Sequence, residues 1–167
     1  MDRYYYAGGK RVALELEPER IAVDPAKARG AGMADLARRV ERDGTRLPGG
    51  RVVVGRATLG AADLLLLRES GGAQAVYRHG AVIAIPLSEV RIEMDPGQRQ
   101  AVLDALEATD IETEIAEDTE ERLVVRPRSG SGDDAMDLAN FIYERARPAA
   151  SAARMVQITR RPEPSRR

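Results

Sequence analysis

The 167-residue chain contains no cysteine and no tryptophan, and it has a single histidine, His79. Without thiols, a disulfide scaffold, a zinc–thiolate site and cysteine catalysis are all excluded. One histidine also leaves no side chains for a metal site built from several imidazoles. We therefore expect neither a metal nor a cofactor.

The chain also lacks long apolar runs and an excess of either charge. No apolar run approaches the roughly 18 residues that a membrane-spanning helix needs, and the N-terminal residues lack the apolar stretch of a secretory signal. The 26 basic residues are balanced by 27 acidic ones, whereas binders of nucleic acid and anionic membranes usually show a basic excess. These features predict a cytoplasmic protein that binds neither membranes nor nucleic acid.

Apolar residues are nevertheless abundant enough for a packed core. Hydrophobic residues make up 43% of the chain and charged residues 32%, as in a folded domain rather than a disordered chain. The length fits one domain or two small ones. The clearest internal break is the glycine-containing stretch 69–72. We therefore predict an N-terminal subdomain over 1–72, a second domain over 73–161 and an extended tail over 162–167.

The first 72 residues predict a β-hairpin followed by a short βαββ unit. Its one predicted helix covers residues 32–43 and ends at Gly44. The predicted strands lie on either side of the turn Gly8–Gly9, over 20–24, over 51–55 and over 63–68. The four leucines of the last run could also form a helical turn, and the sequence does not decide between the two.

The second half predicts the order strand, helix, strand, strand, helix, strand, which is that of a ferredoxin-like βαββαβ fold. Strict alternation over 89–95 turns Val90, Ile92 and Met94 towards a core. A hairpin over 75–86 precedes that strand, helices are predicted over 99–108 and 135–145, and further strands over 111–116, 122–126 and 154–159. The predicted inward faces of the two helices are Val102, Leu103 and Leu106, and Leu138, Ala139 and Ile142.

The two halves begin with similar sequences. Residues 4–24 and 75–95 share an aromatic residue, a glycine turn, an apolar alternation and a strand that ends near an aspartate. We interpret the chain as a degenerate tandem repeat with a period of about 70 residues, in which the first copy lacks the second helix. The sequence as a whole predicts an α+β fold.

Residue patterns that carry catalysis are missing. A serine nucleophile needs a nearby base, and the single histidine lies in a predicted hairpin turn. The loop 129–133 lacks the lysine of a phosphate-binding loop, and the acidic residues around 117–121 lack the spacing of a calcium loop. The predicted central strands also carry none of the aromatic residues that bind RNA on a ferredoxin-like sheet. We therefore predict a protein that is not an enzyme.

The predicted arrangement resembles the N-terminal pro-region of bacterial, fervidolysin-like subtilisin-type serine proteases. The resemblance rests on four segments: the aromatic–Gly–Gly–basic hairpin at 4–16, the second hairpin at 76–80, the strand at 89–92 and the helix at 137–142. It covers nearly the whole chain, by pattern rather than by an invariant motif. The protease domain that follows in the family is not found in these 167 residues, so the chain resembles a pro-region without its protease.

Pro-regions of this family assist the folding of the protease and inhibit it, with their sheet packed on the enzyme and their C-terminal segment lying in the cleft like a substrate. The resemblance implies that this protein binds a separately encoded subtilisin-type protease as an inhibitor or chaperone. The alternative is a protein-binding or scaffold module in a bacterial assembly or signalling system. An enzyme with a carboxylate site is a distant third reading.

Two segments are candidates for contact with such a partner. The acidic turn offers carboxylates that could cap helix N-termini on the partner; its residues are Glu117, Asp118, Glu120 and Glu121. The tail could add as a strand to the edge of a cleft; its residues are Thr159, Arg160, Arg161 and Pro162. The structural alternatives are an ordinary solvated turn and a disordered terminus.

Overall fold

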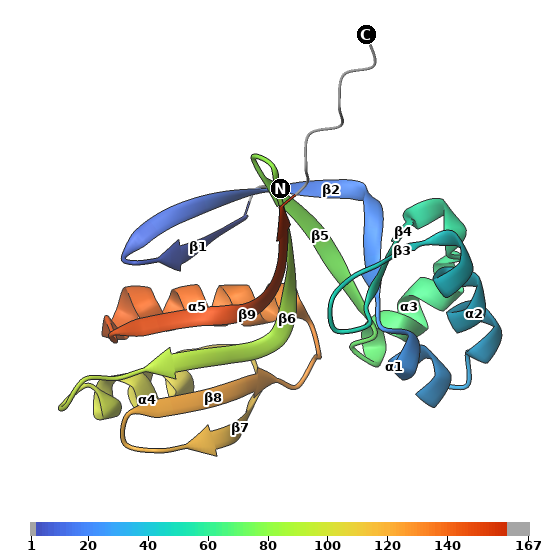
Figure 1. The fold of residues 1–167 in the computed structure, drawn as a ribbon. Coiled ribbons are helices and arrows are strands. Elements are labelled where there is room, and N and C mark those ends of the chain that lie inside the picture. Colours follow the sequence, from blue (N-terminus) through green and yellow to red (C-terminus); the bar gives the residue numbers. More distant parts are fainter. Residues whose placement is uncertain (1–2, 160–167) are drawn as a thin grey trace, which may run out of the picture.

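The chain folds as an α+β protein built on an antiparallel sheet (Figure 1), which confirms the fold class expected from the sequence. A computed structural model describes residues 3–159, and over this range the chain forms nine strands, five α-helices and one short 3₁₀ helix. In chain order they are β1 (Arg3–Ala7), β2 (Lys10–Val23), α1 (Pro25–Gly30), α2 (Ala34–Asp43), β3 (Thr45–Arg46), β4 (Val52–Gly55), η1 (Arg56–Thr58), α3 (Ala61–Glu69), β5 (Ala73–His79), β6 (Val82–Glu93), α4 (Arg99–Ala108), β7 (Thr113–Asp118), β8 (Arg122–Pro127), α5 (Gly132–Ala146) and β9 (Ala150–Thr159).

The hairpin formed by β1 and β2 has its turn at Gly8–Gly9, as predicted. Both glycines have positive φ angles, 55° and 76°, which glycine adopts without the steric penalty of a side chain. Residues 20–23, predicted as the body of a separate strand, are the last part of β2. The register of β2 against β5 shifts between Leu16 and Ile21, because Pro18 lies there and cannot donate to a ladder.

Residues 63–68 form part of helix α3, so their prediction as a strand is wrong. Leu67 is fully buried and Leu64 packs against the same core, whereas Leu65 and Leu66 are 60% and 51% exposed. Burial three residues apart is the spacing of a helix, because a strand would bury alternate residues. The first half therefore contains the second helix that the sequence analysis did not assign to it.

Helix α1 was not predicted, although the sequence carries signals for its start. The Asp24 side chain accepts a hydrogen bond from the backbone N–H of Ala26 at 3.1 Å, and Pro25 occupies the first helical position. An aspartate cap followed by proline is a common start of a helix. The predicted helix over 32–43 is α2, which packs against α1 and ends at Gly44.

In the second half, α4 has the predicted bounds and β7 pairs with β8 around the acidic turn. Val90, Ile92 and Met94 are all buried in the main core, which confirms the predicted alternation. The inward face of α4 is rotated from the prediction. Val102 and Ala105 are buried there, whereas Leu103 and Leu106 are half-buried and pack against the core from its rim.

Helix α5 buries the predicted residues Leu138, Ala139 and Ile142. It begins three residues earlier than predicted, because the Ser131 hydroxyl accepts a hydrogen bond from the backbone N–H of Asp134 and caps its N-terminus. Strand β9 likewise begins four residues earlier than predicted, and it pairs with both ends of β6.

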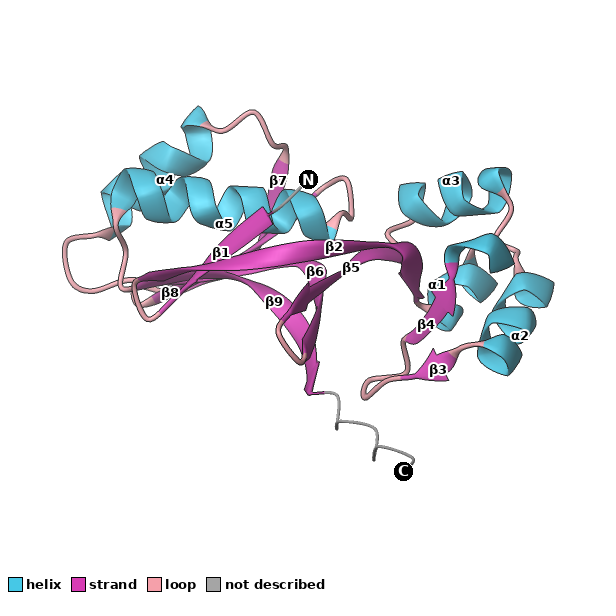
Figure 2. Cartoon of the chain, turned by 90° about the horizontal axis from the view of Figure 1, so that it is seen from above, coloured by secondary structure: helices cyan, strands magenta, loops and turns pink. Residues whose placement is uncertain are grey.

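The strands form one continuous sheet in the order β3–β4–β2–β5–β6–β8–β7, with β1 on β2 and β9 on β6. All strand pairs in residues 3–159 are antiparallel. Helices α4 and α5 lie on one face of strands β6, β8 and β9 (Figure 2). On the opposite face the first part of β6 is covered, because Ile83, Ile85 and Leu87 are buried in a third core together with Leu47 and Val53 of the first half. The same face of residues 89–93 of β6, of β8 and of the first part of β9 has no described element on it. The sheet continues from β2 to β5 across the predicted domain boundary at residue 72.

The N-terminal hairpin belongs to the first half in sequence but packs on the second half in space. Strand β1 lies against α5 (Figure 1), and the Asn140 side-chain N–H donates to the backbone carbonyl of Tyr4 at 2.7 Å. Tyr5 and Leu14 join the same core as α4 and α5. A separate core lies between α1, α2, α3 and strands β2 and β4.

Candidate functional site

Two of the four carboxylates in the acidic turn form ion pairs within the chain. Glu117 accepts from the guanidinium of Arg122 at 2.7 Å, and Asp118 pairs with Arg99. The turn is also held by its own backbone, because the N–H of Thr119 donates to the carbonyl of Arg122 at 2.9 Å. These pairs fix the shape of the turn and neutralise half of its charge.

The other two carboxylates, Glu120 and Glu121, are exposed and have no ion-pair partner in the described part of the chain. With Glu93 and Asp95 they line a shallow, open depression of about 620 Å³ at this end of the sheet. The backbone N–H of Met94 donates to the carbonyl of Glu121 at 2.8 Å and ties the turn to the end of β6. The negative charge that a partner can reach therefore lies at Glu120 and Glu121.

The acidic turn and the predicted tail lie at opposite ends of strand β6. Thr159 is the last described residue and pairs with Val82 at the start of β6, whereas Glu93 at its end pairs with Arg122. A 12-residue strand spans at most about 40 Å. Arg160, Arg161 and Pro162 lie outside the described residues. The two segments therefore do not form one compact site, and the sheet surface lies between them.

Part of that surface, the side of residues 89–93 of β6, of β8 and of residues 152–154 of β9 that faces away from α4 and α5, is uncovered, and we call it the bare face. Side chains alternate along a strand, and Val90, Ile92, Val125 and Ala153 point into the core. Their neighbours must therefore point to the other side. The bare face comprises Glu89, Arg91, Glu93, Arg122, Val124, Arg126, Ala152 and Arg154.

The bare face is charged at its rim and has a small apolar floor. Val124 is only 6% exposed although no element covers it, which is consistent with cover from the aliphatic stems of neighbouring arginines. Arg126 pairs with Glu89 at 3.2 Å. This mixture of charged and apolar residues is typical of a transient protein interface, whereas an exposed hydrophobic core would be mainly apolar.

His79 lies at the end of β5, exposed, with its Nδ1 3.0 Å from the backbone carbonyl of Ala13. This contact ties the β5–β6 turn to β2. Within residues 3–159, no three side chains of the types that bind metals come together as a site. The Ser129 hydroxyl donates to Asp134 at 2.6 Å, so the glycine-rich loop before α5 is held by the acids that follow it.

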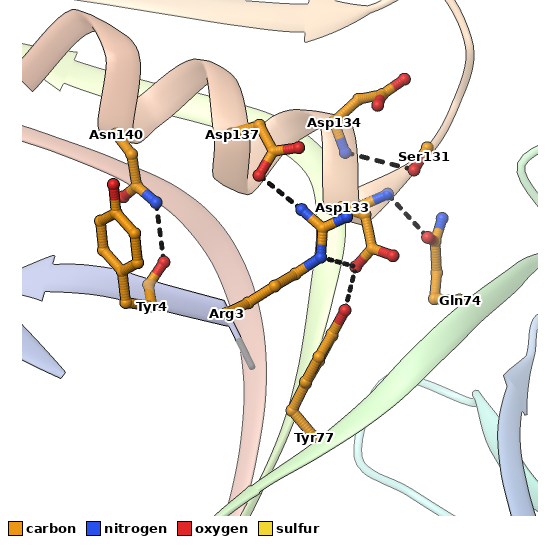
Figure 3. Close-up of polar contacts among 10 residues, drawn as sticks. Arg3, Tyr4, Gln74, Tyr77, Ser131, Asp133, Asp134, Asp137 and Asn140 are labelled. Carbon is orange, nitrogen blue, oxygen red and sulfur yellow. Dashed lines mark hydrogen bonds and ion pairs between the residues drawn. The ribbon is translucent and has the colours of Figure 1, made fainter. Parts of the chain in front are cut away.

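A polar cluster that the sequence analysis missed joins β1, β5 and the start of α5 (Figure 3). The Tyr77 hydroxyl donates to Asp133 at 2.7 Å, and Arg3 pairs with both Asp133 and Asp137. Burial of the Tyr77 ring, and next its hydrogen bond to Asp133, raise the pKa of Tyr77 well above its usual range. The cluster fastens the hairpin to the second half, because its three segments are distant in sequence.

The outer surface of the hairpin carries a second cluster, which is aromatic. Tyr6 stacks on Tyr143 of α5 with ring centroids 4.3 Å apart, and the hydroxyls of Tyr4 and Tyr6 donate to Glu144 at 2.7 and 2.9 Å. The hydrogen bond from Tyr4 is the main cause that lowers the pKa of Glu144. The signal in the sequence was the alternation of Tyr4 and Tyr6, which places both rings on one face of a strand.

Strands β5 and β6 also meet the start of α5 at a tight joint between backbones. The Gln74 side chain accepts from the N–H of Gly132 at 2.7 Å and donates to the carbonyl of Gly130 at 2.8 Å. A Cβ added at Gly132 would lie 2.0 Å from the carbonyl oxygen of Pro86. Only glycine fits there, so the joint leaves no room for a cofactor or substrate.

Comparison with known proteins assigns the chain to no family. No protein-family model and no curated protein matches the chain. Among the described helices, none has the length and apolar character needed to cross a membrane.

Proposed function

We propose that this protein is a non-enzymatic, propeptide-like protein that binds a subtilisin-type protease as an inhibitor or folding chaperone. The observation that carries the proposal is the bare face, a surface of three strands that no described element covers, which lies next to the acidic turn and includes the first part of β9, the strand that leads towards the tail. This is the arrangement that the resemblance to subtilase pro-regions implies for the surface that meets the protease.

We infer further that the second half is a ferredoxin-like unit. Its strands run in the order β9–β6–β8–β7, with β6 and β7 joined by α4, and β8 and β9 joined by α5. Numbered from β6, this is the order 4-1-3-2, which places two split βαβ crossovers on one face of an antiparallel sheet. The helices on the opposite side from the bare face support this assignment.

A tandem repeat is supported by the first half, whose strands run β5–β2–β4–β3 and whose connections are α1 with α2, and α3. Numbered from β2, this is again the order 4-1-3-2. The first strand of each copy, β2 and β6, is also long and irregular near a proline, which is Pro18 in β2 and Pro86 in β6. We therefore infer two degenerate copies, each with two helical connections.

In the proposed complex the bare face contacts the protease over most of the interface. Glu120 and Glu121 are the carboxylates available to partner N–H groups at one end, and each such contact contributes roughly 0.3–1 kcal/mol when exposed. The chain that follows Thr159 reaches the active-site cleft at the other end. Binding and inhibition are thereby assigned to different parts of the chain.

A second candidate function is a protein-binding or scaffold module in a bacterial assembly. It is favoured by the first half, which has its own core and exposes Leu65 and Leu66 on α3 although the proposed protease contact does not use them. Two adjacent exposed leucines are a small patch, but such patches are typical of interaction surfaces when they cluster.

The proposal is tested by titrating a purified subtilisin-type protease with the protein while complex formation and peptide hydrolysis are both followed. Truncation after Thr159 is expected to weaken inhibition much more than binding. Charge reversal at Glu120 and Glu121 is expected to weaken binding itself, and more so at low salt, where exposed charges are least screened. Reversal of Glu107, an exposed carboxylate on α4, serves as the matched control.

Unchanged hydrolysis at saturating protein would reject the inhibitor role. A stable complex under those conditions would favour the scaffold alternative, and the absence of any complex would reject a subtilisin-type partner.

A further inference from the structure

Two of the four arginines on the bare face have carboxylate partners and two do not. Arg122 pairs with Glu117 and Arg126 pairs with Glu89. Arg91 and Arg154 are exposed, and neither has an ion pair within 4 Å among residues 3–159. Two guanidinium groups at the centre of a sheet are therefore left to bind something outside the described chain.

The register of the sheet brings these two arginines close together. Arg91 on β6 lies directly opposite Val124 of β8 on one side and Ala152 of β9 on the other. Arg154 is two residues further along β9 and on the same face. Cross-strand positions of this kind are near enough for long side chains to meet. Two cations in this position repel each other unless a shared anion lies between them.

The neighbouring side chains leave the two guanidinium groups accessible. Val124 and Ala152 are short and apolar, so they form a floor that does not compete for hydrogen bonds. A guanidinium group binds a carboxylate through two parallel hydrogen bonds, and arginine is enriched in the cores of protein interfaces.

The surrounding charge favours a protein ligand over a nucleic acid. Glu89, Glu93, Glu120 and Glu121 lie around the arginines or at the adjacent end of the sheet. A run of phosphates that crossed this surface would meet these carboxylates, whereas a protein surface can place carboxylates at the centre and basic or N–H groups at the rim. The pattern therefore fits a partner with matching, mixed charges.

We infer that Arg91 and Arg154 together recognise a carboxylate pair on the partner protein. The inference rests on the proposed function for the identity of the partner, and it adds the chemistry of that partner's surface. It predicts that the docking surface of the protease is acidic at its centre and has basic or N–H groups facing the acidic turn.

The test uses an active-site-blocked subtilisin-type protease, so that binding is measured without cleavage. Arg91→Gln/Arg154→Gln is expected to weaken binding at least about tenfold and to reduce its dependence on salt, because attraction between opposite charges is screened by ions. Arg56→Gln/Arg68→Gln removes the same charge from exposed positions in the first half and is expected to leave binding unchanged. The two single variants and the thermal midpoints show whether the double variant is folded.

The outcomes distinguish a failure of the arginine contact from a failure of the proposed function. Equal binding by the wild type and by a folded Arg91→Gln/Arg154→Gln variant would overturn the inference and leave the proposed function standing. No binding by the wild type would overturn both. If the wild type binds a single-stranded RNA oligonucleotide and the double variant does not, the arginines belong to a nucleic-acid site and the inference is wrong.

Discussion

The two halves of the chain run through the same order of elements but differ in what covers their last helix. In the second half, α5 has 15 residues and contacts strand β1 of the N-terminal hairpin as well as strands β6 and β9. In the first half, α3 has nine residues and leaves Leu65 and Leu66 in contact with solvent. The larger core thus forms where the hairpin adds to the cover of the helix.

The β1–β2 hairpin causes this difference between the cores, and it also makes the stability of each half depend on the other. Its strands are encoded at the start of the first half, yet Tyr5 and Leu14 complete the core of the second. Residues 3–16 of the first half therefore pack on the second half, and the first half retains a smaller core around α2 and α3, with 11 buried residues against 16. We expect it to be the less stable half, and its stability to depend on its attachment to the second.

The largest expected effect comes from the joint between β6 and the start of α5 in the second half. In Gly132→Ala, the new Cβ would lie 2.0 Å from the carbonyl oxygen of Pro86, so the backbone would have to move. We expect the free energy of unfolding to fall by more than about 4 kcal/mol. The control Gly30→Ala places its Cβ in open space and is expected to be nearly neutral. Urea unfolding followed by circular dichroism measures both, and equal stabilities would contradict the packing at the joint.

The two cores are compared by the same substitution in each. Leu138 in α5 and Leu67 in α3 are both fully buried. Each change to alanine is expected to cost about 2–5 kcal/mol, with Leu138→Ala near the upper end because the covered helix cannot close the cavity. Leu67→Ala is expected near the lower end, since its exposed neighbours Leu65 and Leu66 can shift. A larger loss for Leu67→Ala, measured by urea unfolding, would reverse the ranking of the halves.

The polar cluster under the hairpin predicts a stability change at high pH. The pKa of Tyr77 is raised above its usual range by burial of the ring. Above pH of about 10 the unfolded chain releases this proton while the folded chain keeps it, so the free energy of unfolding falls as pH rises. Tyr77→Phe is expected to cost about 1–2 kcal/mol at neutral pH and to show a weaker decline above pH 10. Tyr143→Phe is the matched control, and an identical decline in wild type and Tyr77→Phe would contradict the burial of the hydroxyl.

The smallest expected effect is a loss of stability at acid pH that arises at the outer surface of the hairpin. Hydrogen bonds from Tyr4 and then Tyr6 lower the pKa of Glu144, so its contribution is present at neutral pH and is lost as pH falls below its usual range of about 4. The wild type is expected to be slightly more stable than Glu144→Gln at pH 7 and equal to it at pH 3. Thermal unfolding at the two pH values, with Glu107→Gln as control, measures this. A constant difference between the two pH values would mean that the carboxylate is not held by the tyrosines.

The sequence predicted local elements well where the pattern was unambiguous. The bounds of α4 and the alternation of Val90, Ile92 and Met94 are set by short-range periodicity, and both are confirmed. The run of four leucines around α3 was misjudged, because a fully apolar run does not distinguish a strand from a helix. The position of the hairpin against α5 was out of reach, since it depends on contacts such as that of Tyr4 with Glu144, 140 residues away in sequence.

The candidate site shows the same limit. The sequence identified the acidic turn, but it did not show that Glu117 and Asp118 are occupied by Arg122 and Arg99. Nor did it show that Arg91 and Arg154 share one face of the sheet, because the pairing of β6 with β9 fixes that position. The sequence shows which residues are charged. Which of those charges remain free to bind a partner depends on the register of the strands.

Hydrogen–deuterium exchange on the complex with an active-site-blocked subtilisin-type protease tests the central claim, that the second half binds through its bare face. We predict added protection of backbone amides in the acidic turn 118–121 and in strands β8 and β9. No change is expected in the first half, from α2 to α3. Protection confined to α3, around Leu65 and Leu66, or absent from the whole chain at saturating protease, would contradict the account.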